Sequence, residues 1–281
     1  MCEFCHRHGE GEKWYLRAEN YSEDLLSDVR RRKFIEGFFS DPGRLRESLA
    51  NLEKLDRVPP FIRGALIRAL STRQKREHFG QVVPFEDLER ILAFVNTIVR
   101  LPCICRRITV GREKRYCYGL SISPGGGEFS RIVEGLERSF LAGPDSSGFE
   151  VLSRDEALRS LGDHEREGLC HTIWTFRTPF IGGLCNCDRS DCIAMRATVS
   201  HGFPVLFRAE YVAAIRPEKC SGCRRCMTVC PFGAIAYSGA EQKSAVDARR
   251  CYGCGVCRTS CSGDAVSLLD RAAVPAGAHR W

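Results

Sequence analysis

The 281-residue sequence has no hydrophobic run long enough to cross a membrane. A spanning helix needs about 20 consecutive apolar residues, whereas the best candidate, residues 91–99, is short and contains Asn96 and Thr97. The first residues, MCEFCHRHGEGEKW, are polar and charged and lack the apolar segment of a secretory signal. We therefore predict no membrane span and a cytoplasmic location, in which thiols stay reduced.

The sequence also lacks the glycine motifs that bind nucleotide phosphates. The segment SISPGGGE, residues 121–128, has neither the Lys-Ser/Thr pair of a P-loop nor a GxGxxG pattern, and it predicts a loop. No flavin or nicotinamide signature occurs elsewhere. Electrons for any redox chemistry are therefore expected to come from a partner protein.

Cysteine, by contrast, is abundant, with 17 residues, of which eight fall between positions 220 and 261. In a reducing compartment, thiols at this density favour metal ligation over disulfides. Residues 220–231 read CSGCRRCMTVCP and residues 251–261 read CYGCGVCRTSC, so the spacing Cys-x2-Cys-x2-Cys-x3-Cys occurs twice. The second run is followed by Ser262 where the first has Pro231. The chain thus contains an internal repeat of about 31 residues.

Both runs resemble the bacterial-type ferredoxin motif, in which three cysteines hold one cubane and the fourth reaches across to the other. Apolar runs at 234–237 and 265–269 predict short strands after each motif. Closed zinc sites are the alternative, but they use two cysteines per knuckle rather than runs of four. Carried over from the motif, one 4Fe-4S cluster is held by Cys220, Cys223, Cys226 and Cys261, and the second by Cys251, Cys254, Cys257 and Cys230.

A second group of cysteines lies in the middle of the chain. Residues 102–107 read PCICRR and residues 182–192 read GGLCNCDRSDC. Alternate residues of a strand point to the same side, so each CxC pair could serve one metal. Spacing alone does not name that metal: a third iron–sulfur cluster, zinc and free thiols all stay open. The candidate ligands are Cys103, Cys105, Cys117, Cys185, Cys187 and Cys192.

Two smaller patterns of cysteine and histidine are weaker indications of a metal or catalytic site. The N-terminal MCEFCHRH brings together Cys2, Cys5, His6 and His8 and formally matches a c-type haem site. Haem attachment normally requires export, so a zinc site, a role at a cluster edge or a frayed terminus is favoured instead. The pair Cys170-His171 is more typical of the core and edge of a strand than of a catalytic dyad.

The hydrophobic patterns predict an α+β fold with three parts: a helical region at 1–100, a cysteine-rich α+β metal-binding region at 101–212 and a ferredoxin-like domain at 213–281. Helices are predicted to begin at Ser22, at Asp41-Pro42, at Pro60 and at Pro84, the last carrying apolar residues from Leu88 to Val99. In the middle part we predict strands at 171–176 and 205–207. Ser153 and Glu156 predict a capped helix.

The formal net charge of +7 is concentrated at the C-terminal end. Residues 201–281 contain 11 basic and 6 acidic side chains, whereas residues 1–100 contain 18 and 16. Nucleic-acid binding normally needs a concentrated basic surface, and the run RRRK at 30–33 is more typical of a solvated helix face. Arg224 and Arg225, inside the first motif, favour a higher potential for the Cys220 cluster. The charges favour a redox partner over nucleic acid.

As a whole, the chain resembles 4Fe-4S dicluster-domain proteins of anaerobic bacteria and archaea, which join a cysteine-rich N-terminal region to a C-terminal ferredoxin module. The resemblance rests on PCICRR, on GLCNCD with Cys192 after it, and on the two ferredoxin motifs. It implies a protein that relays single electrons through two clusters to or from a redox partner. Two alternatives stay open: an oxidoreductase with catalysis at the middle cysteines, and a redox-sensing regulator.

Overall fold

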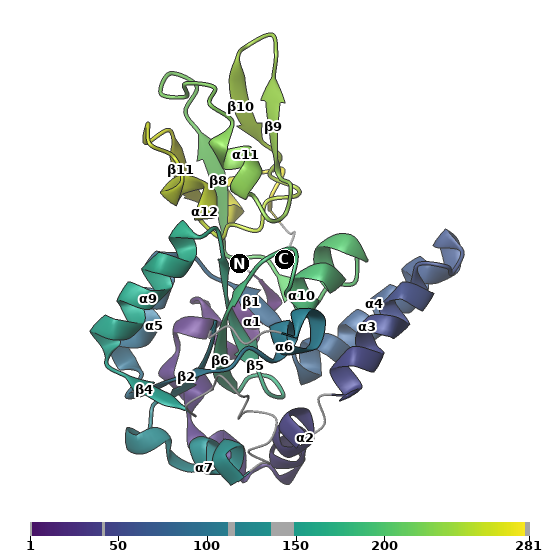
Figure 1. The fold of residues 1–281 in the computed structure, drawn as a ribbon, viewed down its shortest axis with the longest axis vertical. Helices are drawn as coiled ribbons and strands as arrows, with labels where there is room; N and C mark the ends of the chain where they lie inside the picture. The colour runs from purple at the N-terminus through teal and green to yellow at the C-terminus, as the bar shows by residue number, and fades with distance from the viewer. Residues whose placement is uncertain (1, 41–42, 112–115, 136–148, 279–281) are drawn as a thin grey trace.

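The computed structural model describes residues 2–40, 43–111, 116–135 and 149–278. A seven-stranded sheet forms the centre of a larger body, and a smaller cysteine-rich unit lies at one end of it (Figure 1). All pairings in the large sheet are antiparallel except that between β1 and β7. In spatial order the strands are β4 (Glu150–Leu152), β2 (Thr97–Leu101), β3 (Cys117–Ser121), β6 (Ile181–Cys187), β5 (Cys170–Thr175), β1 (Gly80–Val82) and β7 (Leu206–Phe207).

The two faces of this sheet carry different chemistry because successive strand residues point to opposite sides. One face presents Leu120, Ile173 and Leu184 to the main hydrophobic core. The helices α5 (Phe85–Phe94) and α9 (Arg154–Arg166) contribute Leu88 and Leu161 to the same core. Several cysteines occupy the alternate strand positions, so their side chains point to the second face of the sheet.

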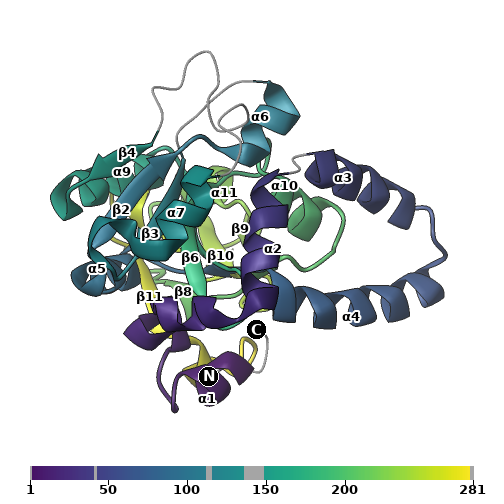
Figure 2. The ribbon, with the colours of Figure 1, turned by 90° about the horizontal axis from the view of Figure 1, so that it is seen from below.

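The second face is covered by α2 (Val29–Ser40), α6 (Ile104–Val110), α7 (Gly127–Gly135) and α10 (Ile193–Met195). Ile35 and Phe39 of α2 pack with Phe129 of α7 in an aromatic cluster. The remaining long helices, α3 (Gly43–Leu55) and α4 (Pro60–Glu77), extend away from the body in both views (Figures 1 and 2). No helix in the described ranges is both long and apolar enough to span a bilayer.

The helices predicted for the first hundred residues are confirmed in part. Helix α4 begins at Pro60 and α5 directly after Pro84, as predicted. Ser22, however, caps a short 3-10 turn, Glu23–Ser27, and α2 begins only at Val29. The start predicted at residues 41–42 lies outside the described residues, and α3 is present from Gly43.

The helix predicted to begin at Pro84 was extended too far, to Val99. Helix α5 ends at Phe94, and Val99 lies in β2, whose backbone pairs with β3 and β4. The β-branched residues Thr97, Ile98 and Val99 favour this extended pairing, which overrides the helical spacing of apolar residues. Both β1 and β2 lie within the first 101 residues and belong to the same sheet as the middle of the chain.

The N-terminal segment packs inside the body. After α1 (Glu3–His8), the 3-10 turns Trp14–Leu16 and Ala18–Tyr21 place Trp14 and Tyr15 in the main core, with no exposed surface. In the basic run at 30–33, Arg30 and Lys33 are exposed, as expected of a solvated face. Arg31 is the exception, because it is buried and donates to the carbonyls of Phe176 and Arg177 at 3.2 and 3.1 Å. Arg31 therefore links α2 to the backbone that follows β5.

Predictions for the middle part were closer. The capping box at Ser153 and Glu156 is present at the start of α9, and strands β5 and β7 cover the predicted segments to within one residue. The glycine segment 121–128 is not a simple loop, since it includes a 3-10 turn, Pro124–Gly126, and the start of α7. The mixture of helices and strands confirms the α+β class.

The smaller unit has two short sheets of two strands each. Strand β8 (Tyr211–Ile215) pairs with β11 (Val266–Asp270), and β9 (Ile235–Ser238) pairs with β10 (Lys243–Val246), all antiparallel. Between them lie the short helices α11 (Arg225–Val229) and α12 (Val256–Thr259). The two strands predicted after the cysteine runs are thus confirmed, each displaced by one residue. The guanidinium of Arg271 donates to the carbonyls of Ala209, Tyr211 and Cys251 and links β8 to the second run.

Candidate metal centres

The two four-cysteine runs form equivalent loops. Gly222 and Gly253 occupy the same position in the repeat, and both have φ of 72°. A Cβ atom would lie 2.4 Å from the carbonyl oxygen of Gln242 at the first position and 2.2 Å from that of Tyr211 at the second. Only glycine lets each loop pass this close to a neighbouring strand or turn in a left-handed conformation.

Backbone donors point at sulfur in both halves of the repeat. The N–H of Ala234 donates to the Sγ of Cys230 at 3.3 Å, and the N–H of Ala265 donates to the Sγ of Cys261 at 3.4 Å. These contacts are equivalent positions of the repeat. A third N–H, from Ala213, donates to Cys251 at 3.4 Å. Such donors stabilise thiolates and tune the metal that thiolates hold.

The fourth cysteine of the first run lies with the three close cysteines of the second. A small cavity is lined by Cys230 together with Cys251, Cys254 and Cys257. In the other half, Cys226 lies within electrostatic range of Cys220 and Cys223, and Cys261 packs against the buried group that contains Cys226. The donor sets are therefore compatible with a cluster held entirely by cysteine in each half.

The two halves differ in their exposure to solvent. Cys223 in the first run is exposed, whereas Cys251, Cys254 and Cys257 are all buried. Hydrogen bonding from the backbone N–H of Arg225 lowers the pKa of Cys223. Burial raises the pKa of Cys257. The first half thus faces water and the second half faces the body.

The middle cysteines are aligned by strand register. Cys117 on β3 lies opposite Cys185 on β6, and Cys170 on β5 lies opposite Cys187 on β6. Directly opposed residues of antiparallel strands point to the same face, and residues 185 and 187 share that face as well. The thiols of Cys185 and Cys117 are 3.4 Å apart. Three strands therefore carry four cysteines on one face of the sheet.

The remaining three members come from helix starts rather than from strands. Cys103 is the N-cap of α6 and Cys192 is the N-cap of α10, so the expectation that the 103–105 pair lies on a strand was wrong. A hydrogen bond to Cys117, together with burial, raises the pKa of Cys103. A hydrogen bond to Cys192, together with burial, raises the pKa of Cys105. All six predicted cysteines therefore belong to one group of neighbouring thiols.

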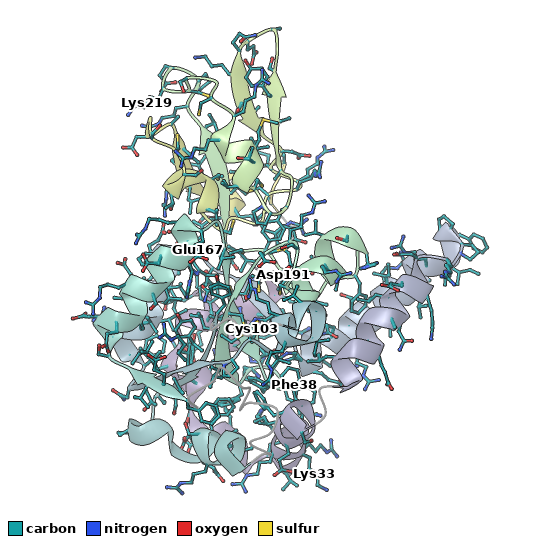
Figure 3. All side chains as sticks on the ribbon, viewed as in Figure 1. Lys33, Phe38, Cys103, Glu167, Asp191 and Lys219 are labelled. Carbon is teal, nitrogen blue, oxygen red and sulfur yellow. The ribbon has the colours of Figure 1, made fainter. Side chains whose placement is uncertain are left out.

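A cavity of about 640 Å³ lies beside this group, and all six cysteines contribute to its wall. The opposite wall is formed by apolar side chains of α2, α3 and α4, including Phe38, Leu52 and Leu66. Figure 3 shows Cys103 and Phe38, one residue from each wall, in the larger body, and Lys219 at the far end of the smaller unit. The middle thiols thus border a space that is mainly hydrophobic.

Comparison with known families identifies the smaller unit. Residues 213–262 match the family model of the 4Fe-4S dicluster domain. This dicluster module accounts for under a fifth of the chain, and it supports the predicted ferredoxin-like fold and the binding of 4Fe-4S clusters there. No curated protein matches the chain.

The dicluster module meets the middle thiols at Cys170, a residue outside every spaced cysteine motif. The thiols of Cys170 and Cys254 belong to the same buried cluster, and Cys170 lowers the pKa of Cys254. Cys170 also lies within electrostatic range of Cys187 and Cys192. Cys170 therefore lies between the second half of the module and the middle group. Only the pairing of β5 with β6 could have revealed this position, because Cys170 belongs to no spaced motif.

A Cys170-His171 dyad is excluded by the same strand geometry. Neighbouring strand residues point to opposite faces, and the Nδ1 atom of His171 lies 2.6 Å from the Oδ1 atom of Asn186. Burial lowers the pKa of His171 to about 4. His171 is a neutral residue of the apolar face.

Of the four N-terminal candidates, only the two cysteines meet. The thiols of Cys2 and Cys5 lie 3.3 Å apart, and both are buried. His6 is exposed, and His8 stacks on Phe4. The histidines take no part in this thiol pair.

Proposed function

We propose that the protein is an iron–sulfur electron-transfer protein that exchanges electrons with a redox partner and contains a third iron–sulfur centre in its body. The eight cysteines of the dicluster module would hold two 4Fe-4S clusters, which supply one-electron redox chemistry when bound. All eight positions are cysteine, so each set of four leaves no ligand position for a substrate. This favours electron transfer over chemistry at the module itself.

The uneven burial of the module supports a direction for this exchange. The loop around Cys223 is open to solvent and is where a partner protein can approach. The loop around Cys254 is enclosed, and its neighbour across the interface is Cys170 of β5. The chain therefore offers one outward and one inward side, and the inward side is in contact with the middle thiols.

Two features of the middle group support a metal centre ligated by thiolates, and the number of thiols favours a cluster over one zinc ion. Six neighbouring thiols exceed the four ligands of a tetrahedral ion. The guanidinium of Arg106 is buried and donates to the Sγ of Cys103 at 3.5 Å and to the carbonyl of Asn186 at 3.2 Å. Asp188 holds the same guanidinium in an ion pair. A fixed positive charge at this place offsets the negative charge of a thiolate-ligated centre.

Anaerobic determination of iron and sulfide with EPR on the full chain tests the proposal. We expect about twelve irons per chain, since each cubane contains four. The double variant Cys185→Ser/Cys187→Ser should fall to about eight and keep the EPR signals of the module. Cys5→Ser, a buried cysteine outside both groups, is the matched control and should keep all twelve. About eight irons in the unmodified chain would show that the middle group holds no iron.

The apolar cavity favours a second candidate, an oxidoreductase whose substrate binds beside the middle thiols and receives electrons from the module. Leu52 and Leu66 face a space of about 640 Å³ that also touches the cysteines. An apolar probe, 1-anilinonaphthalene-8-sulfonate, should then bind saturably and change the EPR signal of the middle centre. Leu52→Trp should abolish binding, whereas Leu269→Trp, on an exposed leucine of β11, should not. Without saturable binding this candidate is dropped.

A further inference from the structure

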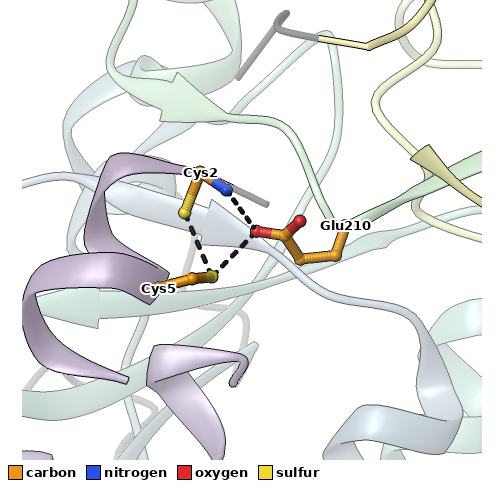
Figure 4. A group of neighbouring side chains, drawn as sticks. All are labelled: Cys2, Cys5 and Glu210. Carbon is orange, nitrogen blue, oxygen red and sulfur yellow. Dashed lines mark hydrogen bonds between the residues drawn. The ribbon is translucent and has the colours of Figure 1, made fainter. Parts of the chain in front are cut away.

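A third group of ligand atoms lies apart from both cysteine groups, at the start of the chain. The Sγ atoms of Cys2 and Cys5 and a carboxylate oxygen of Glu210 all lie within 4.8 Å of one another, and all three residues are buried (Figure 4). Cys5 Sγ is 3.0 Å from Glu210 Oε1, and Cys2 Sγ is 3.3 Å from Cys5 Sγ. The chain brings these residues together across more than 200 positions.

The carboxylate of Glu210 is not fully satisfied by protein. Oε1 accepts from the backbone N–H of Cys2 at 3.2 Å and from the thiol of Cys5. Oε2 has no hydrogen-bond partner among the described residues, and Glu210 is only 3% exposed. The buried guanidinium of Arg271 lies within electrostatic range of Glu210 but donates no hydrogen bond to Oε2. A buried carboxylate is costly unless its charge is offset, and a cation bound at Oε1 would offset the charge of the whole group.

The three atoms are arranged as the ligands of one ion would be. A tetrahedral zinc ion with bonds of about 2.3 Å to sulfur and 2.0 Å to oxygen separates two sulfurs by about 3.8 Å, and a sulfur from an oxygen by about 3.5 Å. The observed separations of 3.3 and 3.0 Å are shorter by about half an ångström. A small outward movement of the side chains would therefore complete the geometry.

We propose that Cys2, Cys5 and Glu210 bind a single zinc ion. On binding, both thiols release their protons to solvent, two zinc–sulfur bonds and one zinc–oxygen bond form, and a water molecule takes the fourth position. The soft thiolates favour zinc over magnesium or calcium. Three ligands that converge within 4.8 Å suit a mononuclear ion, and no cysteine of the other two groups belongs to this set among the described residues.

The position of the site gives it a structural role. Cys5 lies on α1, and Glu210 directly precedes β8, the first strand of the dicluster module's sheet. The ion would therefore attach the N-terminal helix to the base of the module. Loss of the ion is expected to loosen the link between α1 and Glu210, while Phe4 stays packed on Trp14 and Phe79 and the cysteines of the module and of the middle group stay in place.

Metal analysis of the anaerobically purified full chain tests this site. We expect one zinc per chain beside the iron, and an added equivalent of Co²⁺ in zinc-free protein should give thiolate-to-cobalt absorption. Cys5→Ser should lose the zinc and the cobalt band with no change in iron or sulfide. Glu210→Gln should release zinc faster to a chelator. Glu3→Gln, an exposed residue of the same helix, is the control and should match the unmodified chain.

Three results would overturn the proposal. One is the absence of both stoichiometric zinc and the cobalt band in the unmodified chain. Another is retention of zinc by Cys5→Ser, which would place the ion elsewhere. The third is a mass for the peptide containing Cys2 and Cys5 that is lower by two hydrogens, which would mean that the two thiols form a disulfide. Unchanged iron content in each variant shows that the fold has survived.

Discussion

The dicluster module and the middle cysteine group bring their thiols together in opposite ways: through short spacing in the sequence in the first, and through the fold in the second. In the module, each run places three cysteines within seven consecutive residues, and the fold has only to bring two runs together. In the middle group, six thiols come from two helix starts and two neighbouring strands, and their meeting depends on the pairing of Cys117 with Cys185. Local spacing specifies the first site, whereas tertiary structure specifies the second.

This difference predicts that the module keeps its clusters when a cysteine of the middle group is replaced, and that the middle group keeps its metal when a cysteine of the module is replaced. Among the described cysteines, Cys170 lies between the two regions. It packs against Cys254 of the module, and it lies opposite Cys187 of the middle group. Variants of single residues in one region therefore test whether the metal content and the stability of the other region change.

The largest expected effect is that of Cys254→Ser. Cys254 lies in the cavity that it shares with Cys230, Cys251 and Cys257, so its loss should remove the second cluster and about four irons per chain. The middle group should keep its metal, as measured by iron, sulfide and EPR. Cys223→Ser, in the exposed half, is the matched variant and should spare the second cluster. Loss of all iron from Cys254→Ser would contradict a design with two independent regions.

A smaller effect separates the two halves of the module itself. Gly253→Ala and Gly222→Ala impose the same left-handed strain of about 1–2 kcal/mol, but the blocked carbonyl belongs to Tyr211 of β8 in one case and to Gln242 in the exposed β9–β10 turn in the other. Because the turn can shift and the strand cannot, Gly253→Ala should lower the free energy of unfolding more. Anaerobic thermal unfolding of the two variants measures this, and equal losses would show that both halves are held with the same rigidity.

The smallest effect concerns the contact between module and body. Glu86 on α5 accepts two hydrogen bonds of 2.7 Å from Arg258 on α12. Both side chains are about one third exposed, so Glu86→Gln should lower the free energy of unfolding by a few tenths of a kcal/mol to about 1 kcal/mol. The difference should shrink in high salt. A difference that salt leaves unchanged would mean that packing, and not charge, holds the two parts together here.

The ferredoxin motif could be predicted from the sequence because its ligands, its glycines and its following strands all lie within about 50 residues. The register that places Cys170 beside Cys187 could not, since antiparallel pairing between β5 and β6 is decided by tertiary packing. Glu210 was missed for a related reason: its thiol partners lie more than 200 residues away. A single glutamate before a strand carries no local signal.

Some local signals were also misleading. Apolar residues up to Val99 continued the helical spacing of α5, yet the chain turns at residues 95–96 and enters β2. The β-branched run could have indicated a strand, but helix and strand periods cannot be separated over so few residues. Arg31 looked like a surface charge and is instead a buried donor to backbone carbonyls.

The strand order of the large sheet also bears on how the protein is made. The central pair β3–β6 joins residues 64 to 68 positions apart, the pair β6–β5 joins residues 6 to 17 positions apart, and α10 follows only after β6. During synthesis, the middle thiols therefore cannot meet until the ribosome has passed residue 192, whereas each run of the module is complete as soon as it emerges. Iron delivered early would find Cys103 and Cys105 without their partners. Any cluster bound by the middle group, as we propose, would therefore have to be inserted after the chain has been synthesised past Cys192.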